Sequence, residues 1–436
     1  MKIAVVGAGI IGITTAYELA RDGHEVTVYE RRGAAAEEAS FSNAGVLSPG
    51  YVTPWAAPGM PWKVMKQMFG AHAAFRLSLP LAGSDLAWLW RFLSACNLQA
   101  FQTHRTALQQ LALYSRSQLH AITERHSLEY DRSAGYLIAL RTEKDRASVQ
   151  PGLQVLRDLG VSFAEVDEPG ARAIEPAINQ DTRFSGAIHL AQDEVANCRQ
   201  FALLLKDECR KLGVQFEFNT SVQKVLPAEK NTAQGAIIFI ADMQANSQLS
   251  SLLPSAAEAT SELAFDAIVL CTGVQAAKLL QPLGVRLPLR PVYGYSVSAH
   301  IKEPLNAPRS GLMDERYKVS ITRLGQRVRV AGGAQVGGRA GDMNRAAVQT
   351  LYKVLHDWFP GAAVMSQGVQ EWQGARPMLA NRPPVIGKAS TVGSIWLNLG
   401  HGSSGWALSC GSARMLADQM GGRRSDIDST AYALLR

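Results

Sequence analysis

The chain of 436 residues contains little cysteine, and its five cysteines show no pairing pattern. They are odd in number and include no CxxC pair, and they are Cys96, Cys198, Cys209, Cys271 and Cys410. Such a pattern is typical of reduced thiols in a cytoplasmic protein and argues against a disulfide framework. No metal-ligand spacing accompanies the cysteines, so we expect no metal site.

Long hydrophobic runs are also absent. No window approaches about 18 uninterrupted apolar residues, and Asp85 and Arg91 interrupt the best stretch, residues 79–95. A membrane-spanning helix is therefore not expected. Lys2 before an apolar run could imitate a secretory signal, but the glycines that follow explain this segment better. We expect a cytoplasmic location, with peripheral contact to the inner face of the cell membrane as the alternative.

Acidic residues are fewer than basic ones, 37 against 44, which gives a net charge of +7. The basic residues are scattered and no nucleic-acid-binding motif accompanies them, so nucleic acid is not an expected partner. The charge suits anionic partners such as a pyrophosphate, a carboxylate substrate or an acidic membrane surface. The length allows two domains with substantial cores, and the chain has no internal repeats.

The N-terminus carries a glycine turn between a strand and a helix. Residues 3–6 form a short β-branched run, and the pattern GxGxxG follows at Gly7, Gly9 and Gly12. In a dinucleotide-binding βαβ unit these glycines allow the tight turn, the close approach of a pyrophosphate and the packing of helix on strand. The helix N-terminus then offers free N–H groups to phosphates.

A second strand over residues 25–30 completes this unit after a stop at Asp22-Gly23. Glu30 lies 18 residues after Gly12, where a carboxylate meets a ribose 2′-hydroxyl and repels a 2′-phosphate. Arg31 and Arg32 could suggest NADP, but they could equally face solvent. The residues expected at the dinucleotide are Val6, Gly7, Ala8, Gly9, Ile10, Ile11, Gly12, Glu30 and Arg31.

Periodicity and turn residues predict the remaining elements. Helices are expected over residues 99–128, 197–212 and 406–420, with Asn197 and Gln200 as a capping box. Strands are expected over residues 135–140, 185–190, 214–218, 233–242, 265–273, 292–298, 328–330, 385–387 and 395–399. Residues 243–262 are rich in Ser and Ala without a pattern, and we expect a mobile surface loop there.

Four of the eight tryptophans, Trp55, Trp62, Trp88 and Trp90, lie within 36 residues. One interpretation is packing in the core and between domains. The alternative is a surface patch that rests on a membrane face or a partner.

Several dispersed motifs occur in one order along the chain. They are residues 41–51 (FSNAGVLSPGY), 54–59 (PWAAPG), 197–201 (NCRQF), 213–220 (GVQFEFNT), 317–323 (YKVSITR), 375–378 (ARPM) and 398–402 (NLGHG). Together they resemble the FAD-dependent D-amino acid dehydrogenase family, relatives of D-amino acid oxidase and glycine oxidase. The resemblance implies an α/β (overall α+β) fold with a Rossmann-like FAD-binding domain from residues 1–50, 190–288 and 374–425. It implies a substrate domain with a mainly antiparallel sheet from residues 51–189 and 289–373.

The resemblance also implies an activity. The family deaminates D-amino acids to 2-oxo acids by hydride transfer from the α-carbon to the flavin, and electrons pass to a quinone or another acceptor. Alternatives are oxidation of secondary amines such as D-proline, hydroxyproline or N-alkyl glycines, direct reaction with O₂, and a non-catalytic flavoprotein subunit. An NAD dehydrogenase fits less well, because the strand ending at Gly273 and the loop 400–405 suit a long flavin.

The family motifs suggest roles for individual residues. Arg376 matches the position that grips the substrate carboxylate, with an interdomain salt bridge as the alternative. Tyr295 could share the carboxylate, Tyr51 is a weaker candidate together with Tyr293 and Tyr317, and packing is an equal alternative for each of them. His401 is either a general base or a structural residue of its glycine loop.

The flavin is expected to contact four further regions. Small residues near its ring or phosphates are Ser42, Asn43, Ala44 and Gly45, and the Val222 backbone is expected near the adenine. The second nucleotide-facing strand contributes Cys271, Thr272 and Gly273. The N-terminus of the last helix contributes Gly400, Gly402, Ser403, Ser404 and Gly405, whose N–H groups face developing negative charge.

Three stretches depart from the family pattern. Residues 379–384 read LANRPP where the family has TPDGTP, and residues 403–404 read Ser-Ser where the family has Thr-Leu. Tyr293 replaces the lysine of the Lys-Gly-Tyr strand of close relatives. These departures leave the flavin prediction intact and leave the substrate range open.

Overall fold

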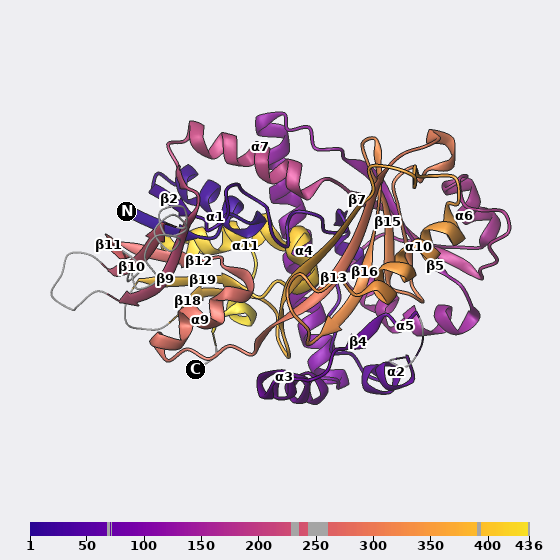
Figure 1. Cartoon of the computed structure of the whole chain (residues 1–436), viewed down its shortest axis with the longest axis horizontal. Coiled ribbons are helices and arrows are strands. Elements are labelled where there is room, and N and C mark those ends of the chain that lie inside the picture. The colour runs from indigo at the N-terminus through magenta and orange to yellow at the C-terminus, as the bar shows by residue number, and fades with distance from the viewer. Residues whose placement is uncertain (68–69, 71, 228–234, 243–259, 390–393, 435–436) are drawn as a thin grey trace, which may run out of the picture.

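The computed structural model describes residues 1–67, 70, 72–227, 235–242, 260–389 and 394–434. Two large sheets lie toward opposite ends of the long axis of the molecule, and helix α4 (Leu98–His126) passes between them (Figure 1). The fold is therefore mixed α/β, with parallel and antiparallel strands in separate sheets.

The first sheet has six strands in the order β18-β19-β12-β1-β2-β8. Their bounds are β1 Lys2–Val6, β2 Glu25–Tyr29, β8 Gln215–Glu217, β12 Ala267–Leu270, β18 Val385–Lys388 and β19 Ile395–Leu399. All pairings are parallel except that of β18 with β19. Parallel strands are buried on both faces, which explains their continuous apolar runs.

Helices and a small sheet cover the two faces of this sheet. One face packs against α1 (Ile10–Arg21), α7 (Cys198–Lys211) and α11 (Gly405–Met420), and α11 is almost wholly buried between α1 and α4. The other face packs against the antiparallel strands β9 (Thr220–Pro227), β10 (Ala236–Asp242) and β11 (Thr260–Phe265). These layers place the β1–α1 turn at the carboxyl edge of the sheet, where nucleotides bind in such folds.

The second sheet has ten strands and is mainly antiparallel. Its main order is β17 Gln370–Leu379, β13 Leu289–His300, β16 Arg327–Val336, β15 Val319–Leu324, β14 Gly311–Asp314, β5 Ser133–Leu140, β7 Gly186–Val195 and β3 Val46–Leu47. Strand β4 (Phe75–Leu77) pairs with β16, and β6 (Ala164–Val166) pairs with β7. Helices α10 (Arg345–Trp358), α5 (Glu143–Asp158) and α6 (Glu168–Ile174) pack their apolar faces on it.

The predicted helices and strands are present, and most of their ends are confirmed to within a few residues. Strands β7 and β16 extend five and six residues beyond their predicted ends, and the strand expected over 265–273 is β12, Ala267–Leu270. The expected capping box is wrong in one half, because Asn197 accepts from the Gln200 N–H but Gln200 Oε1 has no partner among the described residues.

The expected loop at 243–262 is wrong for residues 260–262, which begin β11, and residues 243–259 lie outside the described residues. Strands β7 and β17 run through residues 190 and 374, where domain boundaries were expected. The division into domains therefore stays a prediction.

Helices α2 (Met60–Gln67) and α3 (Gly83–Ser94) flank β4 in the chain, and α3 lies at the edge of the molecule (Figure 1). Within the part of the chain that the structure describes, no helix is long and apolar enough to cross a bilayer. The same residues contain no group of three or more His, Cys, Asp or Glu side chains that could hold a metal ion.

Candidate functional site

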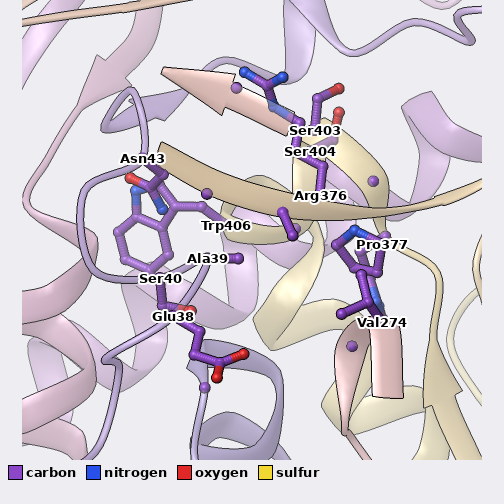
Figure 2. Close-up of a pocket in the computed structure, with 18 of the residues that line it drawn as sticks. Glu38, Ala39, Ser40, Asn43, Val274, Arg376, Pro377, Ser403, Ser404 and Trp406 are labelled. Carbon is purple, nitrogen blue, oxygen red and sulfur yellow. The ribbon is translucent and has the colours of Figure 1, made fainter. Parts of the chain in front are cut away.

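A cavity of about 700 Å³ lies between the two sheets. One end is formed by the carboxyl ends of β1, β2 and β12, and the other by β13, β16 and β17 of the large sheet. Ligand pockets usually measure about 300–1,000 Å³, so this one suits a large ligand. Figure 2 shows loop residues Glu38, Ala39, Ser40 and Asn43 in the same pocket as Arg376 and Pro377 of β17.

The structure brings nearly all the predicted site residues to this one cavity. All line it except Ala8, in the turn after β1, and Gly12, in the first turn of α1. The four residues expected in catalysis, Arg376, Tyr295, His401 and Tyr51, line it as well. Segments that are far apart in the chain therefore meet at a single site.

The glycine turn packs so closely that side chains are excluded. A Cβ at Gly12 would lie 1.8 Å from the carbonyl oxygen of Gly7, and one at Gly7 would lie 2.8 Å from the carbonyl oxygen of Cys271. Gly7 also has a φ of +102°, which L side chains rarely adopt. The close packing turns the N-terminus of α1 toward the cavity, where Ile10 and Ile11 line the wall.

Glu30 ends β2 and joins it to the glycine turn. Its Oε2 accepts a hydrogen bond of 2.8 Å from the Ala8 N–H, and its Oε1 accepts one of 2.9 Å from the Arg32 N–H. Burial raises the pKa of Glu30, and the two backbone donors oppose this rise. Arg31 and Arg32 both contact Glu38. These ion pairs occupy the two arginines that could have favoured a 2′-phosphate.

The loop of residues 40–45 is fastened to both sheets. Ser40 Oγ accepts a 3.0 Å hydrogen bond from the Ile10 N–H at the start of α1. Three bonds join the loop to the large sheet, namely Ser42 Oγ with Ser296 Oγ, Thr322 Oγ1 with the Ala44 carbonyl, and Arg329 Nη1 with the Asn43 carbonyl. The loop therefore fixes its backbone in the cavity wall at the junction of the two sheets.

Four buried polar atoms of the cavity wall have no hydrogen-bond partner among the described residues. They are Thr272 Oγ1, Asn398 Oδ1, His401 Nε2 and Trp406 Nε1. Buried polar groups are nearly always bonded in folded proteins, so this wall is built for a polar ligand. The sequence did not indicate roles for Asn398 and Trp406, although Asn398 is the first residue of the motif 398–402 and Trp406 follows it by four residues.

His401 is buried at the N-terminal end of α11, and burial lowers its pKa to about 3. The imidazole is therefore neutral near neutral pH and is a very weak base. The low pKa favours a structural role for His401 over a role as general base.

Arg376 is a cation without an acidic partner among the described residues. Its Nη1 donates a 2.7 Å hydrogen bond to the Gly333 carbonyl, and its guanidinium carbon lies 5.9 Å from the ring centroid of Trp55. A Cβ at Gly294 would lie 2.2 Å from its Nη2, so a side chain there would force the guanidinium to move. Burial lowers the pKa of Arg376 to about 10, which leaves it charged at neutral pH. For the alternative, an interdomain salt bridge, the described residues place no carboxylate beside Arg376.

The tyrosine hydroxyls already have partners. Tyr295 donates a 2.7 Å hydrogen bond to Gln335 Oε1, and Tyr51 donates one of 2.8 Å to Glu315 Oε2. Tyr293 and Tyr317 do not line the cavity. A role for Tyr295 or Tyr51 in donating to a substrate would therefore break an existing bond.

The cavity is also lined by residues that the sequence did not assign to the site. Aromatic and apolar side chains that line it are Trp55, Met60, Val64, Phe75, Phe92 and Trp372. Polar and charged ones are Gln223, Lys278, Arg316 and Lys318. Lys318 stands within the motif of residues 317–323, but sequence reasoning singled out only its neighbour Tyr317.

Comparison with known proteins gives consistent results. Residues 2–419 match the family model described as FAD dependent oxidoreductase (DAO). D-amino acid dehydrogenases of Rhizobium johnstonii and Bradyrhizobium diazoefficiens are each 37% identical over 438 residues, which cover 100% of this chain and 100% and 99% of theirs. The fold is similar to that of glycine oxidase from Geobacillus kaustophilus, with a TM-score of 0.74, 19% identity, and coverage of 100% of this chain and 98% of that one.

Proposed function

The chain belongs to the family of FAD-dependent oxidoreductases, and we propose that it deaminates D-amino acids to 2-oxo acids. Relatives that align over the full length of this chain carry the name D-amino acid dehydrogenase. The observation that carries the proposal is Arg376, a buried cation in the cavity wall without an acidic partner among the described residues. A substrate carboxylate is the group that such a guanidinium binds best.

FAD is the cofactor of this family, and the described residues fit it. The four unpartnered polar atoms of the wall, Thr272 Oγ1, Asn398 Oδ1, His401 Nε2 and Trp406 Nε1, supply hydrogen bonds that a flavin nucleotide can use. We propose that the β1–α1 turn and Glu30 hold the nucleotide end, with Val222 beside the adenine. The loop 40–45 and the residues 402–405 then hold the flavin ring. When bound, FAD supplies the acceptor for the two electrons of the substrate.

The residues of the chain position the substrate. Arg376 uses one of its five N–H groups on the Gly333 carbonyl, so the others remain for a carboxylate. Its contact with Trp55 and the close backbone at Gly294 restrict the guanidinium to one orientation. We infer that this orientation fixes the α-carbon of the substrate relative to the loop 402–405, because positioning supplies much of the rate in such reactions.

The experiment is anaerobic reduction of the bound flavin, followed by its absorbance, with a panel of amino acids. We expect bleaching by D-amino acids and none by their L-enantiomers. Bleaching by N-alkyl glycines or D-proline alone would replace the proposal with oxidation of secondary amines. No bleaching by any member of the panel would favour a non-catalytic flavoprotein.

The reduced flavin must pass its electrons to an acceptor. We propose a quinone or another carrier rather than O₂, because the relatives that align over the full chain are named dehydrogenases. Purified protein with a D-amino acid should then consume little O₂ until a quinone analogue or an artificial dye is added. Rapid release of peroxide without such an acceptor would identify an oxidase.

We propose peripheral membrane contact through α3. The tryptophans between residues 55 and 90 lie in different environments. Trp88 is only 2% exposed and Trp55 lines the cavity, whereas Trp90 is 74% exposed. Leu86 and Leu93 are exposed on the same face of α3 as Trp90, four and three residues away. An apolar helix face on a chain of net charge +7 suits an anionic membrane surface.

A further inference from the structure

We propose that Tyr51, Glu315 and Lys318 form a relay that accepts the proton of the substrate ammonium group, an inference that rests on the proposed deamination. An amino acid enters near neutral pH with its amine protonated. The nitrogen must lose a proton before the α-carbon can be oxidised, because its lone pair stabilises the developing cation. The site therefore needs a proton acceptor within reach of the substrate.

The three side chains form a closed set of contacts. Tyr51 ends the short helix η1 (Pro49–Tyr51), and Glu315 and Lys318 lie in the turn between β14 and β15. The Tyr51 hydroxyl donates 2.8 Å to Glu315 Oε2, Lys318 Nζ donates 3.1 Å to the Tyr51 oxygen, and Lys318 also pairs with Glu315. Tyr51 and Lys318 line the cavity, whereas Glu315 is buried and does not line it. The phenol thus stands between the cavity and a carboxylate.

Few other side chains of the cavity wall could accept the proton of the substrate ammonium group. The acidic residues that line it among the described ones are Glu30, Glu37 and Glu38, all in the segment that follows β2. The charged lining residues contributed by the large sheet and its turn are basic, namely Arg316, Lys318 and Arg376. Two hydroxyls that line the cavity lead to a buried carboxylate of that half, since Tyr51 donates to Glu315 and Ser48 donates to Asp193. Ser48 is only 2% exposed, so Tyr51 offers the more accessible route. His401, which also lines the cavity, is a poor acceptor because burial lowers its pKa to about 3.

The turn that carries Glu315 and Lys318 is held in an unusual conformation. Lys318 has a φ of +53°, in the left-handed region that non-glycine residues rarely adopt. Asp314, which is fully buried, accepts from the Arg316 and Tyr317 N–H groups at one oxygen and from Trp358 Nε1 and Arg141 Nε at the other. These bonds hold the backbone that presents Lys318 to the phenol.

The proposed step moves two protons and no electrons. The Tyr51 oxygen keeps one lone pair, to which the substrate N–H donates. As that proton reaches the phenol oxygen, the proton of Tyr51 passes to Glu315 Oε2, so ammonium becomes amine and carboxylate becomes carboxylic acid. Burial beside Glu315 holds the pKa of Tyr51 well above its usual value, so the phenol needs Glu315 to take its proton in the same step. Glu315 later returns its proton to water.

Other ionisable groups face the relay from the elements packed around it. They are Arg105 of α4, Asp193 of β7, Tyr136 of β5 and Asp314 at the end of β14. Burial lowers the pKa of Arg105 to about 10 and raises the pKa of Asp193 to about 6. Between these two values neither group changes charge, and this window contains most of the pH range of the test.

The test is the pH dependence of anaerobic flavin reduction at limiting D-amino acid, with Tyr51→Phe and Glu315→Gln. At about pH 7 both variants should be slower by about 100-fold, the lower end of the usual contribution of general base catalysis. At about pH 10, where the amine is largely deprotonated in solution, the deficit should shrink to about threefold. Tyr352→Phe is the matched control, because its hydroxyl also donates to a glutamate, Glu371, at 2.9 Å, and Tyr352 does not line the cavity. We expect it to stay within about threefold at every pH.

Distinct results would overturn the relay. A deficit of equal size at every pH would assign Tyr51 and Glu315 a structural role, and no deficit at neutral pH would remove them from the reaction. FAD content checks folding, and if Glu315→Gln does not fold, Tyr51→Phe decides alone. If no D-amino acid reduces the flavin of wild-type protein, the result contradicts the proposed deamination and says nothing against the relay.

Discussion

Arg376 shows how one residue can be identified from sequence while its surroundings cannot. The motif of residues 375–378 indicates the arginine, but the partners that orient it come from strands far away in the chain. The Gly333 carbonyl lies in β16, and Gly294, which leaves space for the guanidinium, lies in β13. Such contacts depend on strand register, which local sequence does not encode.

Replacement of Arg376 tests its proposed contact with the substrate carboxylate. Arg376→Lys keeps a charge but loses the bidentate geometry, and Arg376→Ala loses both. Loss of one partner of a buried charge pair costs about 2–5 kcal/mol. At about 1.4 kcal/mol per tenfold, kcat/KM of Arg376→Ala should fall roughly 30- to 4,000-fold, with Arg376→Lys in between. Steady-state kinetics with a good D-amino acid measures this change.

Two other arginines serve as controls for Arg376. Arg290 pairs with Asp85 at 2.5 Å, and Arg323 does not line the cavity. Arg323→Ala should leave kcat/KM within about threefold of wild type. If Arg376→Ala also stays within that range, or if it releases FAD, the arginine does not hold the carboxylate and its role is structural.

His401 gives a prediction about stability and pH. Its pKa is lowered to about 3 in the folded protein from 6.5. Above pH 6.5 both the folded and the unfolded states hold neutral histidine, so the full stability is present. As the pH falls from 6.5 toward 3, only the unfolded state gains a proton, and stability falls by up to about 1.4 kcal/mol per pH unit.

Urea unfolding of wild type and His401→Gln between about pH 7 and 5, at a fixed excess of FAD, isolates this contribution. The free energy of unfolding should fall less steeply with acidification in His401→Gln, since the variant lacks the titrating group. Equal slopes for the two proteins would show that His401 is solvated in the folded state. The comparison of slopes removes the effect of all other groups that titrate in this range.

At the scale of elements, prediction from sequence succeeded where the signal is local. The unit β1–α1–β2 has its glycines, stop and terminal acid in one short stretch, and each element forms as expected. Helix α5 was missed, because Pro151 inside it interrupts the helical pattern. Strand β11 was missed at residues 260–262, because a run of small and polar residues resembles a loop until its pairing with β10 is known.

Helix α3 explains why its tryptophans could not be assigned from sequence. Its apolar residues occur on two faces, with Trp88 and Phe92 buried against the large sheet and Leu86, Trp90 and Leu93 exposed. A helix that is apolar on both faces has two contact surfaces, and periodicity alone does not tell which one is covered. Only the packed structure separates the core tryptophan from the surface one.

The exposed face of α3 predicts binding to anionic vesicles. Trp90→Asp removes a large apolar side chain and adds a repulsive charge, so co-sedimentation with vesicles rich in anionic lipid should fall at least about tenfold at low salt. Leu305→Asp is the control, since Leu305 is 84% exposed on another element and should bind as wild type does. Equal binding by wild type and Trp90→Asp, or none by wild type, would leave α3 without a membrane role.

At the scale of the whole molecule, the cavity joins two sheets that have separate cores. The residues that line it come from the carboxyl edge of the parallel sheet and from β13, β16 and β17 of the antiparallel sheet. The loop 40–45 connects them, with hydrogen bonds to both Ile10 and Ser296. A ligand that fills such a cavity contacts both halves, and its binding energy stabilises their association.

This arrangement predicts that FAD stabilises both sheets together. At a free concentration 100-fold above its dissociation constant, a ligand that binds only the folded state adds about 2.7 kcal/mol to stability. Native-state hydrogen exchange, with and without added FAD, should show equal gains in protection for the slowest amides of β1 in one sheet and of β13 in the other. The extracted cofactor should be FAD without NAD, and NAD should give no protection. If protection rises in β1 and β12 but stays unchanged in β13 and β16, the two sheets unfold independently, because the bound flavin then contributes nothing to holding the substrate half in place.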